Sequence, residues 1–216
     1  MKIDTTTPFA TKICSILSDH SEVVSRLDDL GMDAQTLLHI AARACLERAN
    51  ATPFHPANAP GTFAYQHGTF ALRDMYVGKN GWQKERPNGV EAIWNPDTNT
   101  RVVFANVDTC CNPDYDPKPK STKGAGAERT CEPNLFGSLP RFYKEDTSPG
   151  LTFYLMVDDD GRVELSRPII RGKTFSEFPE RIFLKKNQED ETFAHLSLDD
   201  DDTVVDFDPL VAPKTS

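Results

Sequence analysis

Three prolines close together constrain this chain more than any other sequence feature. They lie in the segment ATPFHPANAP, which follows a long stretch with helical periodicity. Proline lacks the backbone N–H that a helix interior needs, and its ring collides with the preceding turn. We therefore expect residues 51–61 to form a surface linker between a helical subdomain, residues 1–50, and an α+β core, residues 62–186.

Helical signals dominate the part before this linker. Apolar residues recur at helical spacing over residues 8–17, which predicts a first helix there. Ser21 is the expected N-cap of a second helix, and Gly31 supplies the left-handed residue that stops it. Asp33 is the expected N-cap of a third helix, which has a broad apolar face.

Strand signals dominate the part after the linker, apart from a short helix expected over residues 68–77. Runs of β-branched and aromatic residues flank two polar turns, as in hairpins. The expected strands are 90–94 paired with 101–107, 151–157 paired with 162–165, and 181–184. The predicted fold class is α+β, in which an N-terminal helical segment precedes a mainly antiparallel sheet. A long irregular loop, with one helical turn near Ala125 to Thr130, joins the hairpins.

The negative charge of the chain is concentrated at its C-terminal end. The net charge is −9, and residues 187–216 hold nine acids and one base, which leaves −1 for the rest. We expect this tail to be disordered when free and to bind a partner, to fold back on the body, or only to solubilise it. The tail residues expected to bind a partner are Asp199, Asp200, Asp201, Asp202, Asp206, Phe207 and Asp208.

The cellular setting follows from two absences in the sequence. No apolar run approaches the roughly 18 residues that span a bilayer, and the N-terminus lacks a basic region followed by an apolar one. The chain has five cysteines, and an odd number without a secretion signal favours reduced thiols over disulfides. We therefore expect a cytoplasmic protein without a membrane partner.

Two groups of basic residues are candidate binding surfaces for phosphate or for an acidic partner. The first, in the long loop, consists of Lys118, Lys120, Lys123 and Arg129. The second consists of Arg167, Arg171, Lys173, Arg181, Lys185 and Lys186. Because the body of the chain is almost neutral, direct binding of nucleic acid is not favoured, and both groups also fit an ordinary solvated surface.

Catalytic and metal-binding signals are weak. A zinc site would need Cys110, Cys111 and Cys131, but adjacent cysteines point apart and do not form the usual spaced pair. A metal-dependent enzyme acting on nucleic acid would use Asp108 at a strand end with Glu91 and with Lys120 or Lys123. Strand-end aspartates also form turns, and the sequence has no Walker loop, G-x-S-x-G or H-E-x-x-H motif. We expect no cofactor, and a non-enzymatic protein is favoured over an enzyme.

The segments ALRDMYVGKNGWQKERPNGVEAIWN, RVVFANVD, KSTKGAGAE and NLFG, between Ala71 and Gly137, resemble accessory proteins of phages, plasmids and integrative elements. This resemblance implies a mobile genetic element, whose small acidic proteins often bind host machinery. The leading hypothesis is an anti-defence inhibitor, similar to an anti-CRISPR protein, that binds a host protein or nucleoprotein complex. The alternatives are the metal-dependent enzyme and a nucleic-acid-binding accessory protein.

Overall fold

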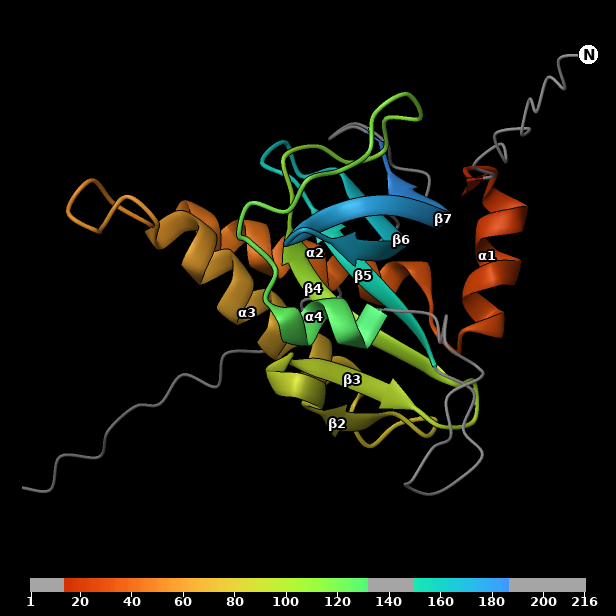
Figure 1. The fold of residues 1–216 in the computed structure, drawn as a ribbon. Helices are drawn as coiled ribbons and strands as arrows, with labels where there is room; N and C mark the ends of the chain where they lie inside the picture. The colour runs from red at the N-terminus through yellow and green to blue at the C-terminus, as the bar shows by residue number, and fades with distance from the viewer. Residues whose placement is uncertain (1–13, 132–149, 187–216) are drawn as a thin grey trace, which may run out of the picture.

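Seven strands form one sheet in the order β1-β7-β6-β5-β4-β3-β2 (Figure 1). The computed structural model describes residues 14–131 and 150–186. The strands are β1 Ser15–Leu17, β2 Gln83–Glu85, β3 Ala92–Asn95, β4 Thr100–Asn106, β5 Leu151–Val157, β6 Val163–Arg171 and β7 Thr174–Lys185. The helices are α1 His20–Asp29, α2 Ala34–Ala49, α3 Ala59–Tyr76 and α4 Ala125–Cys131, with a 3-10 turn η1 at Pro87–Gly89.

The α+β class is confirmed, but the expectation of a mainly antiparallel sheet is wrong. The predicted hairpins are present as the antiparallel pairs β3–β4 and β5–β6, and β6–β7 and β2–β3 are antiparallel as well. However, β4 pairs with β5 in parallel, with Asn106 opposite Val157, and β1 is parallel to β7. The sheet is mixed because the long connection from β4 to β5 returns the chain to the start of the neighbouring strand, which a tight turn cannot do.

Local signals at the helix ends are largely confirmed. Asp33 caps α2, since its carboxylate accepts a 2.7 Å hydrogen bond from the Thr36 amide. Gly31 has the expected positive φ of 69°. The N-cap of α1 is Asp19, two residues before the predicted Ser21, and it accepts a 3.0 Å bond from the Ser21 amide.

Two predictions about the N-terminal part need correction. Residues 15–17 form strand β1, because their backbone pairs with Glu180, Arg181 and Ile182 of β7, whereas helical spacing alone had placed them in a helix. Helix α3 begins at Ala59, inside the predicted linker, and its proline in the first turn fits where no amide donor is needed. The short helix expected over 68–77 is the last part of this longer helix.

Helices α1, α2 and α3 pack against one face of the sheet and share its core. The buried cluster there combines Leu37 and Leu72 from the helices with Ile93, Phe104 and Leu155 from the strands. The helical segment and the sheet therefore share one hydrophobic core, and the helices do not have a separate core of their own.

Helix α4 and the loop that precedes it cover the other face of the sheet (Figure 1). The alternate residues of the same strands, such as Val103 and Tyr154, pack there against Phe175, Ala127 and Cys110. A sheet buried on both faces explains the near-continuous apolar sequence of β5. Within the described part of the chain, no helix combines the length and the apolar character needed to cross a membrane.

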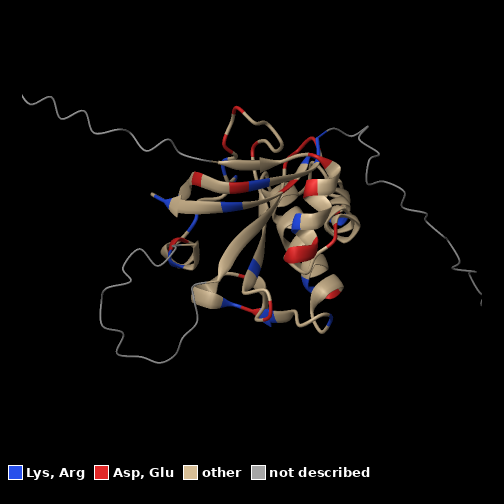
Figure 2. Cartoon of the chain, turned by 90° about the vertical axis from the view of Figure 1, so that its right-hand side faces the viewer, with Lys and Arg blue, Asp and Glu red and all other residues tan. Residues whose placement is uncertain are grey.

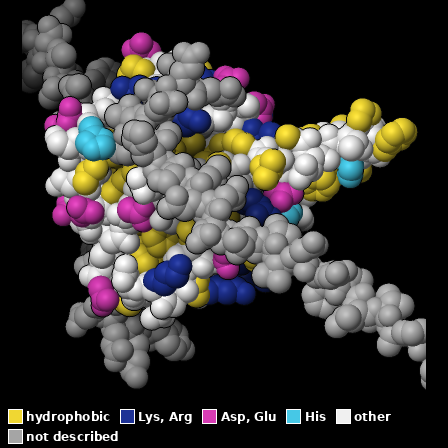
Figure 3. All heavy atoms as spheres, turned by 180° about the vertical axis from the view of Figure 1, so that it is seen from behind, with side chains coloured by type: hydrophobic (Ala, Val, Ile, Leu, Met, Phe, Trp, Pro, Cys, Tyr) yellow, Lys and Arg dark blue, Asp and Glu magenta, His cyan; other side chains and the backbone are white. Residues whose placement is uncertain are grey.

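The surface of the described residues carries both charges mixed together (Figure 2). This mixture fits a body with a formal charge of −1 outside residues 187–216. The end of α2, the loop over residues 51–58 and the start of α3 project from the body (Figures 1 and 3). Phe54 in that loop is fully exposed. The acidic tail, residues 187–216, lies outside the described residues.

Candidate functional site

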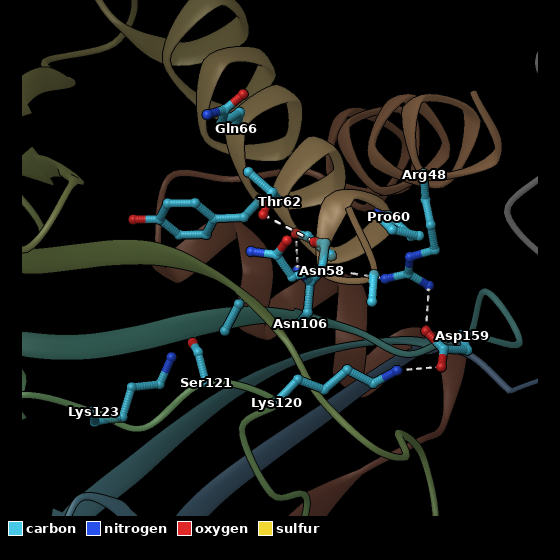
Figure 4. A pocket seen from close by; sticks show the side chains of 14 residues that line it. Arg48, Asn58, Pro60, Thr62, Gln66, Asn106, Lys120, Ser121, Lys123 and Asp159 are labelled. Atoms are coloured by element: carbon cyan, nitrogen blue, oxygen red, sulfur yellow. Dashed lines mark hydrogen bonds and ion pairs between the residues drawn. The ribbon is translucent and has the colours of Figure 1, made fainter. Parts of the chain in front are cut away.

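A pocket of about 590 Å³ lies at the base of this projection, beside the carboxyl ends of β4 and β5 (Figure 4). Asn106 ends β4, and Asp159 follows β5 by two residues. Because β4 and β5 are parallel, their carboxyl ends meet at the same edge of the sheet. The last turn of α2, the first turns of α3 and the loop residues 120–123 complete the wall.

Arg48, in the last turn of α2, is held in a defined position at this pocket. One guanidinium nitrogen, Nη1, donates to the backbone oxygen of Asp158 at 2.7 Å and lies 3.0 Å from the Asp159 carboxylate. The other, Nη2, donates to the side-chain oxygen of Asn106 at 3.1 Å. The Asn106 amide in turn donates to the Gly61 carbonyl at 2.8 Å, which links α2, β4 and α3. These bonds fix the guanidinium before any ligand arrives.

Lys120 reaches the pocket from the long loop. Its backbone N–H donates to the Asn106 carbonyl at 3.0 Å, which anchors the loop to the end of β4. Its amine forms an ion pair with the Asp159 carboxylate, which Arg48 also contacts. The Asp159 side chain is 59% exposed, so solvent screens both ion pairs.

Lys123 is the third cation of the pocket, and its amine lies against aromatic rings. Its backbone N–H donates to the Lys173 carbonyl at 2.9 Å. The half-buried side chain places its amine 5.5 Å from the Tyr154 ring centroid and 5.3 Å from that of Phe175. Loss of hydration lowers the pKa of the Lys123 amine to about 8. In Figure 4, Lys123, Ser121 and Lys120 follow one another along one wall.

The pocket is therefore suited to an anion. Among the residues that the structure describes, its lining includes three cationic side chains and one carboxylate, Asp159. Neutral hydrogen-bonding side chains from Asn58, Thr62 and Ser121 lie on the same lining. The volume falls in the range of small-molecule sites.

The structure divides the predicted basic loop group. Lys120 and Lys123 line the pocket, whereas the Lys118 amine lies over the Tyr115 ring, 5.3 Å from its centroid. Arg129 is exposed on α4 and does not line the pocket. The tail residues expected to bind a partner, Asp199 to Asp202, Asp206, Phe207 and Asp208, lie outside the described residues, so their role stays a prediction.

The residues of the metal-dependent enzyme hypothesis are not brought together. The Asp108 carboxylate accepts hydrogen bonds from the Thr109 and Lys118 amides, both 2.8 Å, and from the Tyr115 hydroxyl at 2.9 Å, so it organises a turn. Glu91 pairs with Arg73 and Arg86 instead. Extending the β3–β4 register by one residue sets Glu91 opposite Phe104, four residues and about 13 Å of strand from Asp108.

The three cysteines of the zinc hypothesis pack in one hydrophobic cluster, but their thiols make different contacts. The Cys111 thiol points at the backbone oxygens of Val163 and Lys185, at 3.1 and 3.3 Å, whereas Cys131 donates to the Tyr154 hydroxyl at 3.8 Å. Burial raises the pKa of the Cys111 thiol to about 12, that of Cys131 to about 11, and that of Cys110 well above its usual value. The part of the chain that the structure describes contains no group of three or more His, Cys, Asp or Glu side chains arranged to hold a metal.

Arg181, expected on a solvated basic surface, is buried. It pairs with Glu164, and its Nη1 donates to the backbone oxygens of Asn112 and Tyr115 at 2.9 and 3.0 Å. The guanidinium thus ties the loop after β4 to strands β6 and β7. A buried arginine needs compensating partners, and those of Arg181 lie 17, 66 and 69 residues away, so a local pattern cannot reveal them.

Of the described residues that line the pocket, sequence reasoning named only Lys120 and Lys123. Among those it missed, Arg48 contacts both Asn106 and Asp159. Arg48 follows the helical period of α2 as an ordinary polar position, and Asn106 and Asp159 look like strand-end and turn residues. Their grouping depends on the parallel pairing of β4 with β5, which no local motif predicts.

Comparison with protein-family models, curated proteins and solved structures finds no match for this chain.

Proposed function

We propose that this chain is a non-enzymatic binding protein whose pocket takes a small molecule carrying a phosphate group. The observation that supports this proposal most is the convergence of Arg48, Lys120 and Lys123 on one pocket. A guanidinium offers planar donors that suit phosphate oxygens, and lysines add positive charge. A phosphate also uses more donors than a carboxylate, which fits the hydroxyl and amide groups that line the same pocket.

Asp159 is the group that an incoming phosphate would displace. Its ion pairs with Arg48 and Lys120 are exposed to solvent, and such pairs contribute only about 0 to 1 kcal/mol each. Arg48 keeps its bonds to Asn106 and to the Asp158 backbone when that pair opens. The guanidinium therefore needs no rearrangement to accept a ligand, which reduces the entropic cost of binding.

The remainder of the ligand would lie against α3. Thr62, Tyr65 and Gln66 line the pocket at a spacing that places them on one helix face. The Tyr65 side chain is partly exposed and offers a ring for an organic group. A phosphate ester with an organic portion thus fits this pocket better than an inorganic anion does.

The test is a titration of the full chain, followed by the backbone amide resonances of Thr62 and Ser121. The probes are inorganic phosphate and pairs of phosphate monoesters and their dephosphorylated counterparts. We expect saturable shifts with the phosphorylated members and none with the counterparts. Arg48→Gln should weaken binding about tenfold or more, equivalent to about 1.4 kcal/mol.

Two variants control this experiment. Lys120→Gln, a surface change, should weaken binding even if Arg48→Gln disturbs folding. Arg43→Gln, on the same helix but outside the pocket lining, should leave binding unchanged. Equal shifts by phosphorylated and dephosphorylated probes, or no response to either pocket variant, would overturn the proposal. Binding of a single-stranded oligonucleotide with a much steeper salt dependence would instead support the nucleic-acid accessory hypothesis.

A second proposal concerns residues 187–216. These residues carry −8 of the net charge of −9, which favours a basic partner such as the channel of a nucleic-acid-handling complex. In this proposal the protein comes from a mobile genetic element and inhibits a host defence complex. The resemblance of residues 71–137 to accessory proteins of such elements supports that setting.

The second proposal requires that the acidic residues inhibit nucleic-acid binding by a host protein. Host proteins that the full chain retains, but a chain ending at residue 186 does not, would be purified and assayed for nucleic-acid binding. We expect the full chain to inhibit that binding and the shorter chain to lose the effect. Equal inhibition by both chains would reject the acidic segment as the inhibitory surface.

A further inference from the structure

The Lys123 amine is set apart from the other two cations of the pocket. Arg48 and Lys120 both contact the Asp159 carboxylate. Within residues 14–131 and 150–186, no carboxylate lies within ion-pair distance of the Lys123 amine. Its neighbours are the rings of Tyr154 and Phe175, with centroids at 5.5 and 5.3 Å.

These surroundings make the amine a better nucleophile than an ordinary lysine. At pH 7.5, an amine with a pKa of about 8 is neutral in roughly a quarter of the molecules, against about one in a thousand for an ordinary lysine. Lysines that form imines are commonly activated in this way, by removal of water and by nearby positive charge. The first of these conditions holds here: the amine lies over the rings of Tyr154 and Phe175, and burial is what lowers its pKa.

The backbone also holds Lys123 in place. The Lys123 amide donates to Lys173 in the turn between β6 and β7, and the Lys120 amide donates to Asn106 at the end of β4. The loop segment 120–123 is thus attached to the sheet at both ends. A nucleophile on a fixed segment can meet a bound reactant in a repeatable geometry.

We propose that Lys123 captures an aldehyde or ketone that carries a phosphate group, by forming a reversible imine. This inference rests on the proposed phosphate-binding function of the pocket. The nitrogen lone pair attacks the carbonyl carbon and forms the new carbon–nitrogen bond. The carbonyl oxygen then leaves as water with the two hydrogens of the neutral amine, so no oxidant or reductant is needed. Arg48 and Lys120 hold the phosphate while the carbonyl group reaches Lys123.

The test uses pyridoxal 5′-phosphate as a phosphorylated aldehyde and pyridoxal as its matched control. The full chain would be incubated with each aldehyde, reduced with borohydride to make the bond permanent, and mapped by peptide mass spectrometry. With the phosphorylated probe we expect Lys123 to be labelled at least ten times faster than Lys118, an exposed lysine in the same loop whose amine lies over the Tyr115 ring. With pyridoxal this preference should fall several-fold.

Variants locate the reaction. Lys123→Arg keeps the positive charge and should abolish labelling at this position without increasing labelling elsewhere. Arg48→Gln or Lys120→Gln should slow labelling of Lys123 by pyridoxal 5′-phosphate but not by pyridoxal. Labelling of Lys123 no faster than that of Lys118 would overturn the inference.

The outcome also separates this inference from the proposed function. If phosphate monoesters bind and Arg48→Gln weakens them, but Lys123 is not labelled preferentially, only the imine chemistry is rejected. If Lys123 is labelled equally fast by both aldehydes and phosphate monoesters do not bind, the phosphate-binding function is rejected and Lys123 is only a reactive amine. The two results therefore distinguish a failure of imine formation by Lys123 from a failure of phosphate binding by the pocket.

Discussion

Arg181 and Glu164 form an ion pair that is almost completely removed from solvent. The distance from Nη2 to the glutamate Oε2 is 2.8 Å, and the two side chains are 1% and 0% exposed. The arginine also lies over the rings of Phe178 and Phe183 and donates to two backbone oxygens in the loop after β4. A single buried charge pair therefore connects β6, β7 and the loop that leads to Lys120.

Removal of one member of this pair should be costly. Arg181→Met leaves the Glu164 carboxylate buried without its cation, and we expect a loss of about 3 to 5 kcal/mol in the free energy of unfolding. Urea denaturation followed by circular dichroism measures it. The double variant Arg181→Met with Glu164→Leu should recover part of the loss. The control Arg171→Met breaks an exposed pair with Glu177 and should cost under about 1 kcal/mol. A similar small loss for Arg181→Met would contradict this prediction.

Gly68 lies where α3 closely approaches the sheet. A Cβ atom at this position would lie 2.5 Å from the ring of Phe104 in β4. Gly68→Ala should therefore lower the free energy of unfolding by about 1 to 3 kcal/mol, although alanine favours helices. Gly61→Ala in the same helix meets no atom within 4 Å and should be neutral or stabilising. Thermal melts of both variants give the comparison, and equal melting temperatures would show that α3 can move away from β4.

The nucleophilicity of Lys123 should depend on pH differently from that of an exposed lysine. Burial lowers the pKa of its amine to about 8, partly opposed by Cys131, so the neutral form increases as pH rises through this value. We expect competitive acetylation of Lys123 to increase roughly tenfold per pH unit below 8 and to level off above it. Labelling of Lys118 should keep increasing to higher pH. Parallel profiles for the two lysines would mean that the rings of Tyr154 and Phe175 do not restrict hydration.

The cysteines should react with a thiol reagent at very different rates. Cys14 is exposed, whereas Cys110 is buried and the pKa values of Cys110, Cys111 and Cys131 are all raised by burial. At pH 8 we expect fast modification of Cys14 and slow modification of these three, because the thiolate is the reactive form. Unfolding the chain should make all of them react quickly. Fast modification of Cys131 in the native state would show that α4 readily moves away from the sheet face that it covers.

Local sequence chemistry predicted much of the secondary structure. Asp33 caps α2, Gly161 takes its positive φ of 75° in the turn before β6, and the polar residues after β3 form the expected hairpin turn. Each feature depends on residues a few positions apart, such as a carboxylate that accepts a bond from an amide three residues later. Sequence also identified Lys120 and Lys123 as candidate binding residues, although without the pocket that joins them.

Only the tertiary structure decided how distant segments meet. Ser15–Leu17 is a strand because it pairs with β7, far along the chain. Arg181 is buried in an ion pair with Glu164, which lies on the neighbouring strand β6. The parallel pairing of β4 and β5 brings the carboxyl ends of these strands to one edge of the sheet, where Arg48 of α2 contacts both Asn106 and Asp159. The sequence by itself determined the caps, the turns and the separation of the acidic C-terminal residues from a nearly neutral body, since these depend on local backbone chemistry and composition. The pocket depends on strand order and burial, whose free energies arise between residues that no local pattern connects.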